Sequence, residues 1–153
     1  MFDRIVHTVT LLGRDRCGSM VIETALVAPI LAVLALGGFE ASSIVARQSE
    51  LQSAAAEAAA IVRASPPETT TERNTIRDVI ANSAGLSTSA VTVDQVYRCG
   101  TGTDYTSTAG SCDTDLLSTY IEIDLQATYR PIWTDFGIGS NVSLDVARTV
   151  LVG

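Results

Sequence analysis

Apolar residues are concentrated in one run near the start of this 153-residue chain. Residues 24–39 carry no charge, and the run extends over residues 20–46 if Glu23 and Glu40 lie near its two ends. A helix needs about 20 apolar residues, each rising 1.5 Å, to cross ~30 Å of hydrocarbon. The pattern therefore predicts one transmembrane helix over roughly these residues. A buried core helix and a secretory signal peptide are the alternative interpretations.

Beyond the run the apolar spacing becomes that of an amphipathic helix. Its inward positions recur at helical intervals, namely Ile44, Leu51, Ala55, Ala58 and Val62. Ser65-Pro66-Pro67 ends the helix, because proline lacks a backbone donor and disfavours helical backbone before it. The sequence thus predicts one helix of about forty residues, about 60 Å long. Pro29 lies inside it and is expected to kink it.

A second, shorter helix is predicted after the two prolines. Thr69 and Glu72 have the spacing of a capping box, and Gly85 stands where a helix C-terminal cap is expected. The apolar side of this helix comprises Ile76, Val79 and Ile80.

The rest of the chain has the alternation of strands. Residues 91–96, 121–129 and 142–152 are the strand candidates, and the second has the clearest period of two. The predicted fold class is α+β. A long N-terminal helix, membrane-spanning in its first half, packs on a small antiparallel sheet, and a short second helix is added.

Charge is distributed unevenly along the chain. Residues 1–18 carry a net charge of +1 and the remaining residues carry −8, and the two together give the net charge of −7 of the whole chain. Arg4, Arg14 and Arg16 precede the apolar run, and only Arg47 follows it closely. The positive-inside rule therefore keeps the N-terminus in the cytoplasm and exports everything after Arg47.

The cysteines fit an exported domain. Cys99 and Cys112 enclose a hairpin-length loop, and disulfides persist outside the cytoplasm, so we expect them to be bridged. Closing such a loop contributes about 3 kcal/mol in the chain-entropy model. Two buried free thiols are the alternative. Cys17 precedes the apolar run, which is the wrong order for a lipid-anchored lipoprotein.

Composition excludes several functions. All ten basic residues are Arg and none are clustered, so no nucleic-acid partner is expected. With one histidine, His7, a catalytic triad or zinc site has few residues to draw on. No enzymatic motif occurs, so we predict neither catalysis nor a cofactor. Asp104, Asp113 and Asp115 lack the dense spacing of a calcium loop, so no metal is predicted.

One acid lies inside the apolar run, where a carboxylate costs about 2.5–3.5 kcal/mol at the helix centre and less near the interface. A basic leader, Gly18, Glu23 five residues later and an apolar helix together resemble the class III signal of type IV prepilins. The resemblance implies cleavage after Gly18 by a membrane peptidase, with Ser19 as the methylated mature N-terminus. It also implies that Glu23 pairs with the N-terminal amine of a neighbouring subunit.

A narrower resemblance follows from GSMVIETALVAPILAVLALGGFEAS, which combines Gly18, Glu23 and Pro29. This segment resembles TadE-like proteins of the tight adherence (Tad) pilus system. The closing segment QATYRPIWTDFGIGSNVSLDVARTVLV, which includes Arg148, also resembles the end of TadE-like domains. The family implies a pilin-like fold, with a leader over residues 1–18, a transmembrane helix over 19–46 and an exported domain over 47–153.

The Tad relatives differ in size and sequence. Thr24 stands where Flp major pilins carry Tyr, and the 135 residues after Gly18 exceed the length of those pilins. TadG-like proteins are usually far longer, whereas TadF-like proteins are of similar length, so a TadF-like identity is left open.

The resemblance implies a minor pilin or pseudopilin of a Tad-type (type IVc) pilus, placed in the bacterial inner membrane with its C-terminal domain in the periplasm. The implied partners are prepilin peptidase, the Tad assembly platform, and Flp-like, TadF-like and TadG-like subunits. A single-pass membrane protein whose exported domain binds a partner unrelated to pili is the main alternative. A soluble periplasmic protein would need cleavage after the apolar run, near Ala35, Gly37 and Gly38.

Overall fold

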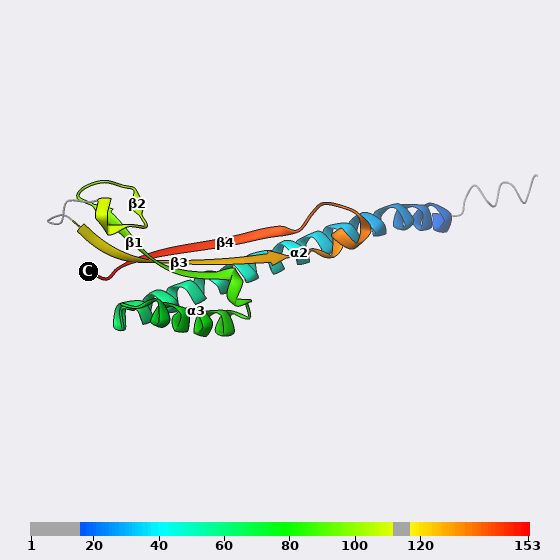
Figure 1. Cartoon of the computed structure of the whole chain (residues 1–153). Coiled ribbons are helices and arrows are strands. Elements are labelled where there is room, and N and C mark those ends of the chain that lie inside the picture. Colours follow the sequence, from blue (N-terminus) through cyan, green and yellow to red (C-terminus); the bar gives the residue numbers. More distant parts are fainter. Residues whose placement is uncertain (1–15, 112–116) are drawn as a thin grey trace, which may run out of the picture. The chain divides into compact units, whose positions relative to one another are not determined.

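The structure is a computed structural model that describes residues 16–111 and 117–153, with side chains described for residues 20–110 and 117–153. It contains two long helices and a four-stranded antiparallel sheet (Figure 1). The chain divides into two compact units, of which the first ends at Ser42 and the second is Ser43–Gly153. The predicted α+β fold class is confirmed.

Helix α2 spans Arg16–Ala64 and contains 49 residues. It begins before the predicted start near Met20. It ends directly before Ser65, as the two following prolines predict. The helix assignment is unbroken at Pro29.

The C-terminal part of α2 supplies one wall of the core in the second unit. Its predicted inward positions from Leu51 onward are at most 1% exposed, namely Leu51, Ala55, Ala58 and Val62. They join one apolar cluster with Ile121, Ile123 and Leu125 of the sheet, each 0% exposed. The apolar residues that recur every 3.6 positions along the helix therefore pack against apolar residues that recur every two positions along the strand.

Helix α3 spans Thr70–Ala84, and both of its predicted caps are present. The Thr69 hydroxyl accepts from the Glu72 amide at 3.2 Å, and the Glu72 carboxylate accepts from the Thr69 amide at 3.1 Å. The backbone amides of Thr69 and Glu68 both donate to the Glu72 carboxylate, and they lower the pKa of Glu72 below its ordinary value. Gly85 takes the left-handed conformation with φ 63°.

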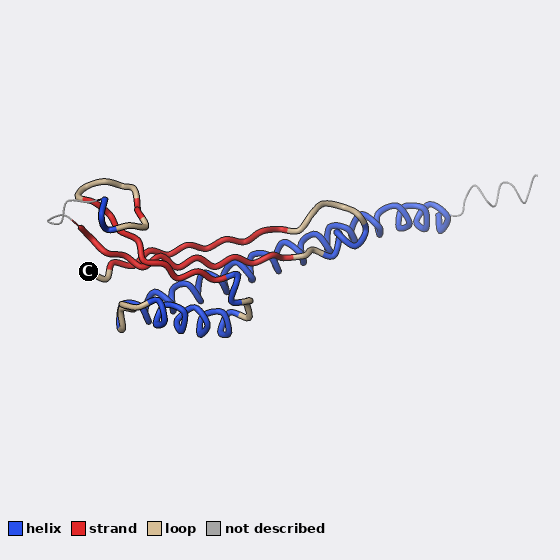
Figure 2. Tube along the Cα trace, in the orientation of Figure 1, coloured by secondary structure: helices blue, strands red, loops and turns tan. Residues whose placement is uncertain are grey.

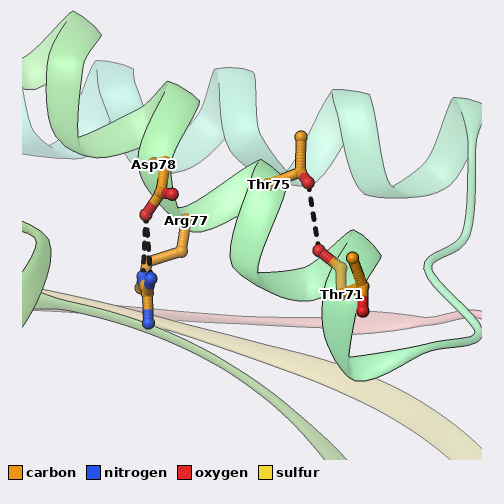
Figure 3. Close-up of polar contacts among 4 residues, drawn as sticks. All are labelled: Thr71, Thr75, Arg77 and Asp78. Atoms are coloured by element: carbon orange, nitrogen blue, oxygen red, sulfur yellow. Dashed lines mark hydrogen bonds and ion pairs between the residues drawn. The ribbon is translucent and has the colours of Figure 1, made fainter.

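The packing side of α3 corrects one sequence prediction. Ile80 and Ala81 are buried, whereas Val79 is 52% exposed. A helix turns by about 100° per residue, so the face that buries Ile80 and Ala81 turns Val79 toward solvent. The polar side carries local hydrogen bonds (Figure 3), in which the Thr75 hydroxyl donates to the Thr71 carbonyl at 3.0 Å and Arg77 donates to Asp78.

The sheet has the strand order β2-β1-β3-β4, and every neighbouring pair is antiparallel. Figure 2 shows the strands in red beside the helices in blue. The strands are β1 Val91–Cys99, β2 Tyr105–Thr106, β3 Leu117–Tyr129 and β4 Val142–Leu151. Short 3-10 helices occupy Thr88–Ala90, Ala109–Ser111 and Ile132–Phe136. The three predicted strands are all present. Strand β2 was not predicted, because two residues are too few to show an alternation.

The face of the sheet that points away from the helices is acidic. Asp94 of β1 lies directly opposite Glu122 of β3, and Asp124 is two residues farther along the same face. Burial raises the pKa of Glu122 above its ordinary value, and the carboxylates of Asp124 and Asp94 raise it further. Like charges placed directly opposite destabilise a strand pair.

Glu122→Gln is therefore expected to stabilise the second unit at neutral pH by about 0.2–1 kcal/mol. A carboxyl group whose pKa is raised by folding favours the folded state while it is protonated, and this contribution is lost as pH rises through the raised pKa. The gain should consequently shrink at mildly acidic pH. Denaturant unfolding of the full chain in detergent micelles, at both pH values, measures it.

Asp145→Asn is the matched control, because Asp145 faces the uncharged Gln126 across the β3–β4 pair. It should change the free energy of unfolding less than Glu122→Gln does. An equal gain from Glu122→Gln at both pH values would contradict the electrostatic origin.

Candidate functional site

The apolar half of α2 has no protein around it to bury it. Large side chains from Met20 to Phe39 are mostly more than half exposed, for example Val21 at 68% and Leu34 at 65%. None of the most apolar 18-residue window is buried. This excludes a core helix within the described chain. Length and composition suffice to cross a membrane, although a signal sequence near the N-terminus satisfies the same two conditions.

Glu23 lies on this exposed apolar surface. A shallow groove of about 340 Å³ runs along one side of the helix, lined by Met20, Glu23, Thr24, Val27, Ala28 and Leu31. Glu23 is the ionisable member of that lining. The hydroxyl of Thr24 is satisfied locally, because it donates to the Met20 carbonyl at 2.8 Å. The arrangement thus presents one carboxylate within an apolar stripe, open to an external partner.

The predicted processing site lies within the same helix. Gly18 and Ser19 have helical backbone at the start of α2, and their side chains are outside the described set. Pro29 lies within the helix and provides no backbone donor for the carbonyl four residues earlier. Cleavage after Gly18 and a kink at Pro29 both stay predictions.

The structure adds one residue that the sequence did not mark. Glu40 is only 2% exposed, and it is the single polar or charged side chain recorded as buried among the described residues. Sequence reasoning placed it near the end of the apolar run. A charge in that place gives no local signal of burial in the sequence.

The predicted disulfide lies at the far end of the sheet. Cys99, the last residue of β1, is disulfide-bonded. Cys112, its predicted partner, lies outside the described residues, so the pairing stays a prediction. Three neighbouring strands contribute an aromatic cluster. The rings of Tyr105 and Tyr120 meet edge to face with their centroids 5.2 Å apart, and the guanidinium of Arg98, which precedes Cys99, lies 5.1 Å from the centre of the Tyr120 ring.

No group of three or more His, Cys, Asp or Glu side chains suited to a metal occurs within residues 16–111 and 117–153. Asp104 lies within these described residues and belongs to no such group. Asp113 and Asp115 lie outside the described residues. The distinctive feature of the described part of the chain is the exposed apolar helix with Glu23.

Comparison with known proteins bears on this helix. The family model described as TadE-like protein matches residues 18–60. The chain carries a TadE-like N-terminal segment. This TadE-like segment begins at the predicted cleavage residue Gly18 and includes Glu23 and Pro29, so the predicted resemblance is confirmed there. No curated protein and no solved structure matches the chain.

The TadE-like segment covers the apolar half of α2 and part of its amphipathic half. The match stops before the second helix and the sheet, so the resemblance of the closing segment that includes Arg148 stays a prediction. The family association with the Tad pilus system therefore rests on the helix, not on the sheet.

The disulfide gives a prediction for the sheet. If Cys99 pairs with Cys112, replacing both by Ser should lower the free energy of unfolding of the second unit by about 2–4 kcal/mol without changing membrane insertion. Alkylation mapping of protein from the native host should find both thiols blocked until reduction. Free thiols at both positions would contradict the pairing, and Cys17→Ser is the control that should leave stability unchanged.

Proposed function

We propose that this protein is a minor pilin or pseudopilin of a Tad-type pilus, anchored in the bacterial inner membrane and required for pilus assembly. One observation carries the proposal: the TadE-like segment includes the apolar stretch of α2, whose most apolar window has no buried residue and which bears the carboxylate of Glu23. The apolar side chains of this helix have to be covered by something other than the chain's own domain. The proposal includes no catalytic step.

Glu23 supplies the assembly chemistry in this proposal. An ionised carboxylate in a membrane segment is costly unless a partner neutralises it. The amine released at Ser19 by cleavage after Gly18 is the cation that the prepilin pattern offers. An amine and a carboxylate from neighbouring helices, desolvated together, fix the register of those helices. Prepilin peptidase, the assembly platform and the Flp-like, TadF-like and TadG-like subunits are the partners proposed on the same basis.

A second candidate is a single-pass membrane protein whose periplasmic domain binds a partner unrelated to pili. It is favoured by the second unit having an apolar core of its own, with Leu51, Ile123 and Val150 at most 1% exposed. In this alternative the helix only tethers the domain. Glu23 separates the two candidates, because a tether has no use for a carboxylate.

The processing prediction tests the prepilin element. In cells that contain a prepilin peptidase, the mature chain is expected to begin at a methylated Ser19, and without the peptidase it should keep residues 1–18. Gly18→Leu should block cleavage, because a bulky side chain replaces the smallest residue at the cut, while Gly18→Ala should be processed. Intact mass measures all three states. An uncleaved wild-type chain in peptidase-competent cells would sink the prediction.

The assembly prediction tests Glu23 itself. Glu23→Leu is expected to be expressed, cleaved and inserted, yet to abolish piliation. Removing one member of a buried ion pair costs about 3–5 kcal/mol, which changes an assembly equilibrium by two orders of magnitude or more. Piliation of a strain that carries only the variant measures the effect.

Val27→Leu is the matched control for Glu23→Leu, because Val27 lines the same groove without bearing a charge. It should leave piliation unchanged. If Glu23→Leu supports wild-type piliation, the tethered-domain alternative replaces the pilin proposal.

A further inference from the structure

The loop between β3 and β4 exposes a group of large apolar side chains. Phe136 is 76% exposed, Ile138 is 65% exposed and Ile132 is 49% exposed. All three lie in or beside the 3-10 helix Ile132–Phe136. Contiguous exposed apolar side chains of this size mark an interaction surface more often than isolated ones do.

Hydrogen bonds hold the loop in one conformation. The Thr134 hydroxyl donates to the Pro131 carbonyl at 2.7 Å, and the Ile138 amide donates to the Trp133 carbonyl at 3.1 Å. Gly139 has φ 73°, and a Cβ there would lie 3.3 Å from Nε1 of Trp133. The exposed side chains are therefore fixed outward by the loop backbone, rather than left outside by disorder.

The loop also neutralises its own charges. Arg130 and Asp135 form an ion pair within it. Its other side chains, from Pro131 to Asn141, are uncharged. An apolar surface without net charge is suited to a low-dielectric environment, where an unpaired charge would be costly.

The register of the sheet places this loop at the end of the second unit where α2 enters. Arg47 of α2 donates to the carbonyl of Ala84, the last residue of α3, at 3.2 Å. A short connection leads from there to Val91, which pairs with Leu125. Strand β3 then continues past Leu125 to Tyr129, by about 13 Å at 3.3 Å per residue.

The loop after Tyr129 therefore extends beyond the end of the second unit marked by Arg47, and Ser43, the first residue of that unit, precedes Arg47 by about one turn of α2. Ile44, Tyr129 and Val142 pack against the same apolar core. The end of the second unit that bears Phe136 and Ile138 is thus also the end at which its own part of α2 begins.

We propose that the β3–β4 loop is a membrane-contact element, which inserts Phe136 and Ile138 into the interface of the bilayer that the apolar helix spans. The proposal rests on the membrane anchoring in the proposed function. Aromatic and aliphatic side chains at the level of the lipid headgroups are favourable because their apolar part leaves water while the backbone stays hydrated. The contact would hold the periplasmic domain against the membrane before assembly.

Lipid is favoured over a protein partner by the chemistry and position of the loop. The loop lies at the same end of the second unit as Ser43, the residue through which the apolar helix is covalently connected to that unit. It has no unpaired charge to give direction to a protein contact, since Arg130 and Asp135 satisfy each other. A second copy of the chain covering the loop is treated as an outcome of the test.

Trp133 is the only tryptophan of the chain and lies within the loop, so its fluorescence reports the surroundings of the loop alone. The full chain is reconstituted in phosphatidylcholine vesicles that carry bromine either near the headgroup or near the ends of the acyl chains. Bromine near the headgroup is expected to quench Trp133 more strongly. The Phe136→Ser, Ile138→Ser double variant should reduce that quenching at least about twofold.

Leu151→Ser is the matched control, because Leu151 is 58% exposed at the opposite end of β4. It should leave the quenching unchanged. Unquenched Trp133 that remains accessible to aqueous iodide would overturn the proposal. The proposal would also be overturned if Trp133 were shielded from both bromine and iodide and became accessible only after the chain was diluted in the bilayer. That result would show that a second copy of the chain covers the loop.

Alkaline extraction of the same vesicles distinguishes a failure of the loop proposal from a failure of the membrane anchoring on which it rests. A chain that resists extraction but shows no lipid quenching is anchored without loop contact, which overturns only the loop proposal. A chain released by alkali is not anchored, which overturns both.

Discussion

The apolar contact between α2 and β3 is the interaction on which the rest of the second unit depends. Leu51 and Val62 bracket the helix side, and Ile121 and Leu125 lie on the strand side, all 0% exposed. Burying a Leu or Ile side chain contributes about 1.5–3 kcal/mol. Ala55 and Ala58 lie between the larger helix residues on the same buried side of α2.

That contact also divides one helix between two environments. Within the second unit, α2 needs only one apolar stripe, because its other side meets water. Over residues 25–39 the side chains are apolar on all sides and mostly exposed, as at Leu34. A helix satisfies its own backbone hydrogen bonds, so the same secondary structure serves a domain and a bilayer. Only the side-chain pattern has to change.

The open face of the sheet shows what this arrangement costs. The helices cover one face, and the other carries Asp94, Glu122 and Asp124 close together. Such a face stays hydrated and resists edge-to-edge or face-to-face association, although the opposed carboxylates weaken the strand pair. Arg148 acts against association in a similar way. It lies on the edge strand β4, opposite Ile123 and on the core side of the sheet, and it is exposed. An inward charge on an edge strand disfavours further strand pairing.

The sequence by itself determined the elements whose causes are local. The prolines after Ser65, the capping box of Thr69 and Glu72, and the alternation around Ile123 each act within a few residues, and each produced the predicted element. The TadE-like resemblance was likewise readable from one continuous helix. The exposure of Val79 and the raised pKa of Glu122 were decided only by tertiary structure, because each depends on side chains brought together from distant segments. The place of the β3–β4 loop also needed the strand register, which no single segment encodes.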